Sequence, residues 1–231
     1  MAPTITLSKD FDINNLSFSD VKVLENGGRL VYVSYRKAPL LLQTPVMKAP
    51  FGLSKWDSND SKANAKYTLD LSFQGADGSN SLAAFQKVLE TIDERMVTEC
   101  FANASTWMKG KKISSREIVE ALYTPVLKYA KDKETGEVSD KYPPTIKLSV
   151  PFKDGAFACD VYDDKKQLAD LNAMETKGAK VTAIVQCTGV WQAAGRYGLS
   201  WKIIQMRVQP SATHLKSYAF QDESDNEEEA A

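Results

Sequence analysis

The sequence predicts an α+β fold that is mainly β: an antiparallel β-barrel with one long amphipathic helix inserted between its strands. Apolar and polar residues alternate in several segments before residue 75 and after residue 144, and this period of two is typical of β-strands. Between these segments the apolar residues recur every three or four positions, which is the period of a helix buried on one side. Closure of the sheet would leave no open edge, although alternation does not choose between barrel topologies.

The first predicted strands lie in the N-terminal third. In segment 29–36 the side chains of Val31, Val33 and Tyr35 share one face. Segment 39–56 is interrupted by three prolines, which favours edge strands and loops because proline cannot donate to a sheet ladder. Segment 66–73 alternates without interruption and is expected to be a strand of the barrel.

The central part of the chain is predicted to be helical. The long helix begins after a cap at Asn80 or Ser81 and ends near residue 104. Its apolar stripe consists of Leu82, Phe85, Leu89, Ile92, Met96 and Cys100. A shorter helix, started by Ser114 or Ser115, is predicted over 115–123, and a polar loop or hairpin over 131–144.

The C-terminal third returns to strands. Segment 145–150 is expected to pair with 157–162 across a turn at 153–155. Segments 180–191 and 196–209 are expected to form a long hairpin closed by residues 192–195. The apolar phase shifts by one residue between Ile203 and Ile204, which is what a β-bulge would produce.

The chain is expected to form one domain followed by a tail. Length and the lack of an internal linker predict a single domain over 1–210, with its core in 29–209, and a flexible acidic tail over 211–231. Neither a secretory signal nor a run of 18 apolar residues is recognisable, so we expect an intracellular protein without a membrane span.

Composition argues against an enzyme. The cysteines Cys100, Cys159 and Cys187 are few and far apart, which predicts reduced, buried thiols instead of disulfides or a zinc site. The single histidine, His214, leaves no cluster for a metal site or a His-dependent triad. The glycines lack the spacing of a phosphate-binding loop. We therefore expect no metal, no cofactor and no catalysis.

The charge is distributed unevenly along the chain. The formal net charge is −1, but the last ten residues contain six acids and no base. Without them the chain has 29 basic and 24 acidic residues, a net charge of +5. A basic body with an acidic end favours binding of a polyanion, with the acidic segment competing for the same surface. The acids concerned are Asp222, Glu223, Asp225, Glu227, Glu228 and Glu229.

Aromatic and basic residues interleave in several segments, a combination that suits single-stranded nucleic acid. Cations neutralise phosphates, and aromatic rings stack on unpaired bases. A turn is poorly placed to bury both aromatic residues of the hairpin tip 191–197, whereas Trp201 is expected in the core. The expected phosphate contacts are Arg36, Lys48, Lys55, Arg196 and Lys202, and the expected stacking residues are Tyr35, Phe51, Trp56, Trp191 and Tyr197.

The order of these parts resembles the single-stranded-DNA-binding protein family of short-tailed phages that carry an acidic C-terminal tail. The resemblance covers residues 29–229: strand KYTLDLSF, the long helix, strands TIKLSV and FACDVY, the hairpin VTAIVQCTGVW…YGLSWKIIQMRV and the acidic end. The run LLLQTPVMKAPFGLS (40–54) makes it closest to the counterparts in nucleo-cytoplasmic large DNA viruses. The resemblance implies an OB-like barrel with a helix packed against one end.

The resemblance also implies a function. It predicts sequence-independent binding of single-stranded DNA in viral DNA replication, recombination or repair, at replication sites in the host nucleus or a cytoplasmic virus factory. The acidic tail would recruit DNA polymerase and helicase or primase, and a homodimer is one expected state. Two alternatives remain open: a virion or scaffold β-domain that binds other proteins, and an RNA-binding protein with the same fold.

Overall fold

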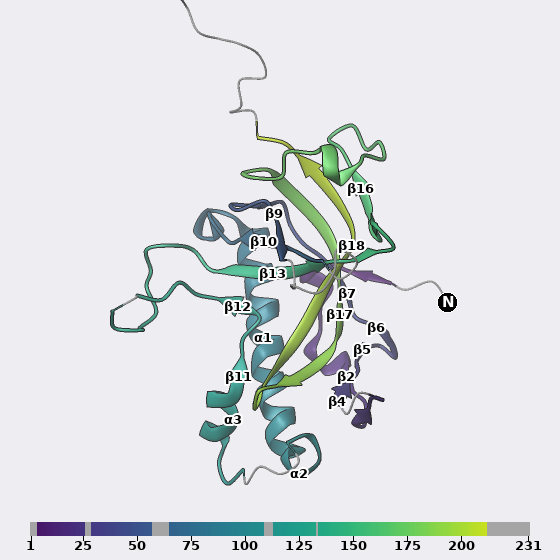
Figure 1. The fold of residues 1–231 in the computed structure, drawn as a ribbon. Coiled ribbons are helices and arrows are strands. Elements are labelled where there is room, and N and C mark those ends of the chain that lie inside the picture. The colour runs from purple at the N-terminus through teal and green to yellow at the C-terminus, as the bar shows by residue number, and fades with distance from the viewer. Residues whose placement is uncertain (1–3, 26–28, 57–64, 109–112, 133, 212–231) are drawn as a thin grey trace, which may run out of the picture.

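The computed structural model describes residues 4–25, 29–56, 65–108, 113–132 and 134–211. In Figure 1 a strongly curved sheet lies against one long helix, α1 (Asn80–Ala102). The expected class, mainly β with few helices, is confirmed. The predicted acidic residues 222–229 lie outside the described residues.

The main sheet collects strands from the whole described chain. Its order is β1-β7-β17-β8-β10-β13-β18-β11, and five further strands attach at its sides. The strands along this order are β1 (Ile5–Thr6), β7 (Leu41–Gln43), β17 (Lys180–Ala193), β8 (Met47–Lys48), β10 (Lys66–Ser72), β13 (Thr145–Val150), β18 (Arg196–Gln209) and β11 (Tyr123–Thr124). Those at the sides are β3 (Lys22–Val23), β4 (Arg29–Val31), β9 (Leu53–Trp56), β12 (Leu127–Lys128) and β16 (Asp160–Tyr162).

Two small sheets accompany the main one. They are the three-stranded sheet of β2 (Leu16–Phe18), β5 (Val33–Tyr35) and β6 (Ala38–Pro39), and the hairpin of β14 (Phe152–Lys153) and β15 (Ala156–Phe157).

The barrel is not closed by continuous ladders, which corrects the expectation. β17 pairs with both β8 and β18, but β8 meets β10 only at Lys48 and Ser72, and β13 meets β18 only at Ser149 and Lys202. The sheet is also not wholly antiparallel, because β1–β7, β11–β18, β13–β18 and β16–β18 are parallel pairs. The short strands β1, β11 and β16 come from parts of the chain that are distant from their partners. Their direction relative to the neighbouring strand is therefore not set by a hairpin turn.

The hairpin of β17 and β18 confirms the prediction and refines its turn. The turn is tighter than expected, because only Ala194 and Gly195 lie between the strands, with φ of 47° and 78°. Two positive φ angles are typical of a type I′ turn, whose twist matches that of the strands. The register shifts where Ile184 faces Gln205 and Val185 faces Ile203, so Ile204 is the extra residue of the predicted bulge.

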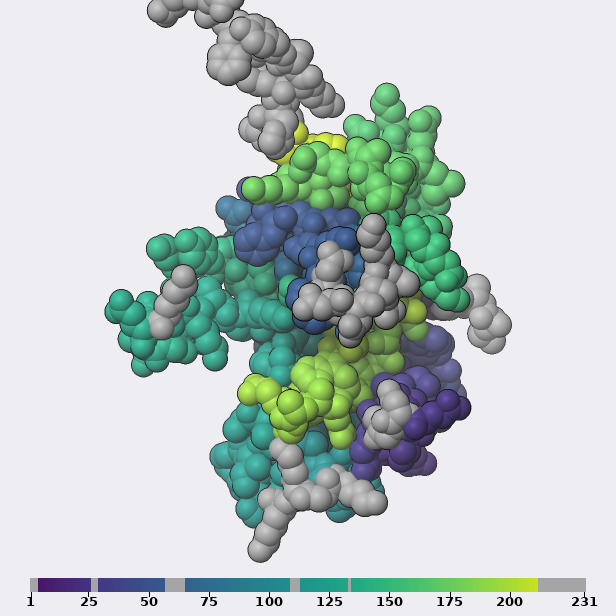
Figure 2. Space-filling model, in the orientation of Figure 1, coloured from purple at the N-terminus to yellow at the C-terminus, as the bar shows by residue number. Residues whose placement is uncertain are grey.

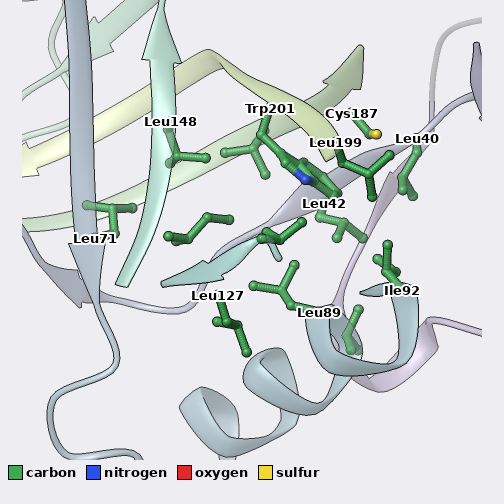
Figure 3. Close-up of a cluster of buried hydrophobic side chains, with 14 of the residues drawn as sticks. Leu40, Leu42, Leu71, Leu89, Ile92, Leu127, Leu148, Cys187, Leu199 and Trp201 are labelled. Carbon is green, nitrogen blue, oxygen red and sulfur yellow. The ribbon is translucent and has the colours of Figure 1, made fainter. Parts of the chain in front are cut away.

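Helix α1 forms where the sequence has its apolar stripe. The hydroxyl of Ser79 accepts a hydrogen bond from the Leu82 amide, so the cap is Ser79 instead of Asn80 or Ser81. Figure 3 shows Leu89 and Ile92 of this helix in one buried cluster with Leu71, Leu148 and Trp201 of the sheet, and Trp201 is in the core as expected. No helix of the described residues is long and apolar enough to span a membrane.

The other helices are short. The predicted second helix is α3 (Arg116–Leu122), joined to α1 by Arg116, whose guanidinium contacts Glu94 at 2.5 Å. Among the described residues, the remaining helical turns are α2 (Ala104–Trp107) and the 3-10 helices Ser8–Asp10, Ile13–Asn15, Ala76–Gly78 and Leu171–Ala173.

Two strand predictions are corrected. The segment 29–36 is two strands, β4 and β5, because Tyr32 bonds to Ser19 between them and each strand joins a different sheet. Segment 157–162 does not pair with β13. The turn at 153–155 instead closes the small β14–β15 hairpin, and β16 runs parallel to β18.

The thiols are placed as structural groups. Cys100 and Cys187 are buried, Cys159 is half-buried, and all three are unpaired. Burial raises the pKa of these thiols to about 11, 12 and 11, respectively, so each stays protonated at neutral pH.

Candidate nucleic-acid interface

One face of the main sheet carries a row of polar residues across four neighbouring strands. The cross-strand register aligns Ser54 of β9 with Thr68 of β10, Thr68 with Ser149 of β13, and Ser149 with Lys202 of β18. Paired residues point to the same side of a sheet, so these four side chains share one face. We call the surface built around this row the outer face, since α1 packs on the other side.

One end of the outer face carries Trp56. It is 64% exposed and lies opposite Lys66, whose ammonium is 5.9 Å from the centre of the indole ring. Trp56 follows Ser54 by two residues and therefore lies on the same face. An exposed ring beside a cation is a surface on which an unpaired base can stack.

The other end carries Trp191, which is half-buried. It pairs with Gly198 across the β17–β18 hairpin. A Cβ at Gly198 would lie 2.9 Å from the ring carbon Cζ2 of Trp191 and 2.9 Å from the carbonyl oxygen of Thr124. The indole therefore rests on the backbone of β18 at a position that only glycine leaves open.

A cleft opens in the sheet between these two ends. Beyond their single pairing, β13 and β18 diverge, and the gap of about 250 Å³ is bounded by the connection from β11 to β12. Trp191 and Trp201 line it together with Lys128, Lys147 and Ser200. The cleft thus combines an aromatic lining with two cations.

The cations of the cleft have one acidic neighbour. The ammonium of Lys147 lies 3.0 Å from the carboxylate of Asp70, which faces it across β10 and β13. Partial burial, and then the charge of Lys147, lower the pKa of Lys128, while Asp70 raises it. A phosphate beside Lys128 would offset both the partial burial and the repulsion between the lysines.

A half-buried carboxylate holds the wall of the cleft in place. The carboxylate of Asp93 on α1 accepts hydrogen bonds from the Tyr123 hydroxyl at 2.5 Å and from the Val126 amide at 3.1 Å. Burial raises the pKa of Asp93 to about 6, although these hydrogen bonds act in the opposite direction. On the other side, the Arg196 guanidinium donates to Thr124 Oγ1 and to the Tyr123 carbonyl.

The structure places three of the expected binding residues on the outer face: Trp56, Trp191 and Lys202. In Figure 2 the yellow-green tip of the β17–β18 hairpin and the dark-blue segment that contains β9 lie on the side toward the viewer. Taking about 3.3 Å per residue and about 4.8 Å per strand, Trp56 and Trp191 are about 28 Å apart along the sheet. An extended strand of several nucleotides would span that length.

The structure corrects part of the prediction for the hairpin tip. Tyr197 is fully buried, and its hydroxyl donates to the Val119 carbonyl, so it belongs to the core and offers no ring face for stacking. Arg196 is exposed, but its guanidinium is bound to Tyr123 and Thr124 of β11. The tip thus presents one aromatic residue, Trp191, instead of two.

Tyr35 and Arg36 are also placed differently from the expectation. Tyr35 is 5% exposed, stacks on Phe11 and bonds through its hydroxyl to Asp12. Arg36 lies over the Tyr35 ring in the turn between β5 and β6, which belong to the three-stranded sheet. Neither residue is part of the outer face.

The remaining predicted residues lie apart from the cleft. Lys48 is exposed at the opposite end of β10 from Trp56, where it pairs with Lys180. Phe51 is 65% exposed in the turn between β8 and β9. Lys55 points to the opposite face of β9 from Trp56.

Three lysines of this surface were not predicted from the sequence: Lys66, Lys128 and Lys147. Lys147 occupies the polar phase of TIKLSV, so the alternation already marked it as exposed. Lys66 precedes the apolar phase of β10 in the same way. Lys128 carries no such signal, because its two-residue strand is defined only by pairing with β13.

Comparisons with known proteins give one family and several distant likenesses. A model of the family of unknown function (DUF5871) matches residues 76–222. The uncharacterized protein L291 of Acanthamoeba polyphaga mimivirus is 23% identical over an alignment of 179 residues that covers 74% of this chain and 26% of that protein. The chain therefore spans about a quarter of the length of the curated relative that it matches. Closeness to counterparts in large DNA viruses stays a prediction.

Two similar solved structures are of phage proteins. One is gp2.5, a single-stranded DNA binding protein encoded by bacteriophage T7, with a TM-score of 0.45, 10% identity, and coverage of 79% of this chain and 98% of that chain. Another is the single-stranded DNA-binding protein of bacteriophage Enc34 in complex with ssDNA, with a TM-score of 0.43, 12% identity, and coverage of 83% and 91%.

Proposed function

This chain belongs to the family of unknown function DUF5871, and we propose that it binds single-stranded DNA without sequence preference. The observation that carries the proposal is the outer face, on which Trp56 and Trp191 lie on either side of Lys147 and Lys202. Indole rings stack on any unpaired base, and ammonium groups contact the phosphates between them.

The proposed role is binding without catalysis. The side chains of the outer face are indoles, hydroxyls and lysines, and its carboxylate, Asp70, is paired with Lys147. These side chains can neutralise phosphates and stack on bases, but none of them is a nucleophile held by a general base. Within the described ranges no group of three or more His, Cys, Asp or Glu residues is arranged to hold a metal ion.

A fluorescence titration tests the proposal. Oligo-dT is added to the full chain at several salt concentrations while tryptophan emission is followed. We expect quenching, because stacked bases quench indoles such as Trp56 and Trp191, and we expect binding to weaken as salt rises. The same titration with oligo-rU and with duplex DNA separates the RNA-binding and duplex-binding alternatives. No binding of any of the three at low salt would leave the protein-binding β-domain as the better interpretation.

We further propose that the acidic residues 222–229 compete with DNA for the basic domain. The support is the charge asymmetry of the sequence, in which six acids follow a body of net charge +5. Tethering gives such a segment a high effective concentration at its own domain. Under this proposal residues 1–210 are the binding domain and 211–231 its tail, and removal of residues 222–231 tightens DNA binding.

The cellular role is proposed on the same basis. A protein that coats single strands serves DNA replication, recombination or repair, and displaced acidic tails can dock on basic surfaces of a polymerase, helicase or primase. A homodimer and a location at viral replication sites complete the proposal. Co-sedimentation of the full chain and of the 1–221 form with a replicative polymerase, with and without oligo-dT, tests the recruitment step.

A further inference from the structure

The cleft between β13 and β18 has features that the stacking of a strand on a flat surface does not require. Its volume of about 250 Å³ is below the roughly 300–1,000 Å³ of sites for drug-sized ligands. The space therefore suits one flat ring system and not a longer segment. Both of its aromatic lining residues, Trp191 and Trp201, come from the β17–β18 hairpin.

Trp191 is held as a fixed platform. Its ring rests on Gly198, and the Thr124 carbonyl oxygen is also 2.9 Å from the Cβ position of that glycine. The strand β11, which supplies Thr124, is fixed by the contact of Arg196 with Thr124 and by the hydrogen bond from the Tyr123 hydroxyl to Asp93. The platform and the opposite wall are thus positioned before any ligand arrives, which reduces the entropic cost of binding.

The lining carries charge beside the aromatic platform. Lys128 and Lys147 supply two cations at the cleft. A ligand that combines a flat ring with flanking phosphates matches both the ring of Trp191 and these ammonium groups.

We propose that this cleft receives one unpaired nucleobase, stacked on Trp191, while Lys128 and Lys147 bind the phosphates on its two sides. This inference rests on the proposed function and adds the place where single strands are distinguished from duplexes. A base within a duplex is stacked on both faces and paired at its edge, so it cannot enter a walled cleft without being flipped out. Binding to the rest of the outer face does not require a base to leave a duplex.

The test compares strands with and without bases. Trp191→Leu is expected to weaken binding of oligo-dT by about 5- to 150-fold, the range for loss of one stacked base. On a strand of the same length made of abasic residues, the same substitution is expected to have no effect. Lys128→Gln is expected to weaken both strands equally, because it removes a phosphate contact. Tyr142→Leu and Lys153→Gln, at exposed positions away from the cleft, are the matched controls.

A second measurement needs no substitution. An oligo-dT containing one 5-iodouracil is bound to the full chain, irradiated and digested with trypsin. Cleavage after Lys180, Arg196 and Lys202 places Trp191 in peptide 181–196 and Trp201 in peptide 197–202. We expect the crosslinked base on one or both of these peptides.

The outcomes separate the two proposals. If oligo-dT binds but crosslinks only to the peptide beginning at Trp56, or if Trp191→Leu behaves like Tyr142→Leu, the cleft proposal is overturned and the DNA-binding proposal stands. If Trp191→Leu weakens the abasic strand as much as oligo-dT, the residue supports the fold instead of a base, and the cleft proposal is again overturned. If the unaltered chain binds no oligo-dT, both proposals fail.

Discussion

Gly198 shows how one small residue fixes an aromatic side chain. Its position on β18 lies under the Trp191 ring and beside the Thr124 carbonyl, and a Cβ added there would lie 2.9 Å from each. Because contacts of this length do not occur for real Cβ atoms, any side chain here must displace either the ring or β11. The residue therefore controls both the stacking platform and the spacing of two strands.

Substitution Gly198→Ala tests this control. We expect a loss of about 1–3 kcal/mol in the free energy of unfolding, the usual cost of an added methyl group in a packed site. Urea unfolding followed by circular dichroism measures it. Gly78→Ala is the matched control, because a Cβ there meets nothing within 4 Å. Equal stability of the two variants would contradict the close packing at Gly198.

Asp93 is the second residue whose position serves its neighbours. Its carboxylate connects α1 to Tyr123 and Val126, and burial raises its pKa to about 6. The folded protein therefore binds a proton more tightly than the unfolded chain between about pH 4 and pH 6. Across this window the contribution of Asp93 to the free energy of unfolding falls as the pH rises.

Substitution Asp93→Asn removes this titration. We expect the variant to gain stability relative to the original chain between pH 4 and pH 7, by up to about 3 kcal/mol for the full shift. Urea midpoints at pH 4, 5, 6 and 7 measure the difference. Asp132→Asn is the control, because backbone hydrogen bonds from Thr135 and Glu134 lower the pKa of Asp132 below its ordinary value of 3.8, so its difference from the original chain is expected to stay nearly constant from pH 5 to pH 7. A constant difference between Asp93→Asn and the original chain at all four pH values would contradict the raised pKa.

The residues at the tip of the β17–β18 hairpin show what strand alternation could and could not predict. Alternation predicted strands on both sides of the tip, but not the number of residues in the turn. With a two-residue turn, Trp191 faces Gly198 and Gln192 faces Tyr197, so the two aromatic residues lie on opposite faces. The predicted four-residue loop would pair Trp191 with Arg196 and would also place the two rings on opposite faces. Strand alternation up to the turn therefore already separates Trp191 from Tyr197, and the expectation that both rings are exposed failed because it treated the tip as a loop.

The β17–β18 hairpin is the element that the sequence predicted best. Both strands, the bulge at Ile204 and the inward Trp201 follow from local alternation. The neighbours of β13 did not follow, because its pairing with β10 joins segments separated by α1. Short strands such as β11 and β12 are defined by partners rather than by their own two residues. Local pattern thus predicts long hairpins but not the contacts that form the cleft.

The turn of this hairpin offers a prediction at the scale of the element. Ala194 adopts φ of 47°, which is unfavourable for a residue with a Cβ, and Asn-Gly is the preferred pair in type I′ turns. We expect Ala194→Asn to raise the free energy of unfolding by about 0.5–1 kcal/mol. Thermal unfolding of this variant beside Ala193→Asn measures it. A gain that is equal at both positions would exclude backbone strain as the cause.

At the scale of the whole molecule, charge organises the surface. The body of the chain is basic and the end acidic, and the described lysines include the four on the outer face: Lys66, Lys128, Lys147 and Lys202. The sequence predicted the sign of this surface from composition. It could not predict which lysines gather, because Lys66 and Lys128 come from strands that are brought together only by the fold.

Salt dependence is the corresponding prediction. Four phosphate contacts would give a slope of about −3 in a plot of log affinity against log salt, at about −0.7 for each contact on a single strand. Lys202→Gln is expected to reduce the slope by about 0.7 units. Fluorescence titrations at several salt concentrations measure both slopes, with Lys153→Gln as the control. An unchanged slope for Lys202→Gln would remove Lys202 from the phosphate contacts.

The single pairing between β13 and β18 has a consequence for amide hydrogen exchange. Where two strands diverge, the amides that face the gap lack a partner strand, whereas those in the long β17–β18 ladder are bonded along its length. Exchange along the two borders of the gap, near Ser149 and Ser200, is then limited by access of water and not by global unfolding. A ligand seated between the strands would slow exchange at these borders first, and the footprint would locate it without any substitution.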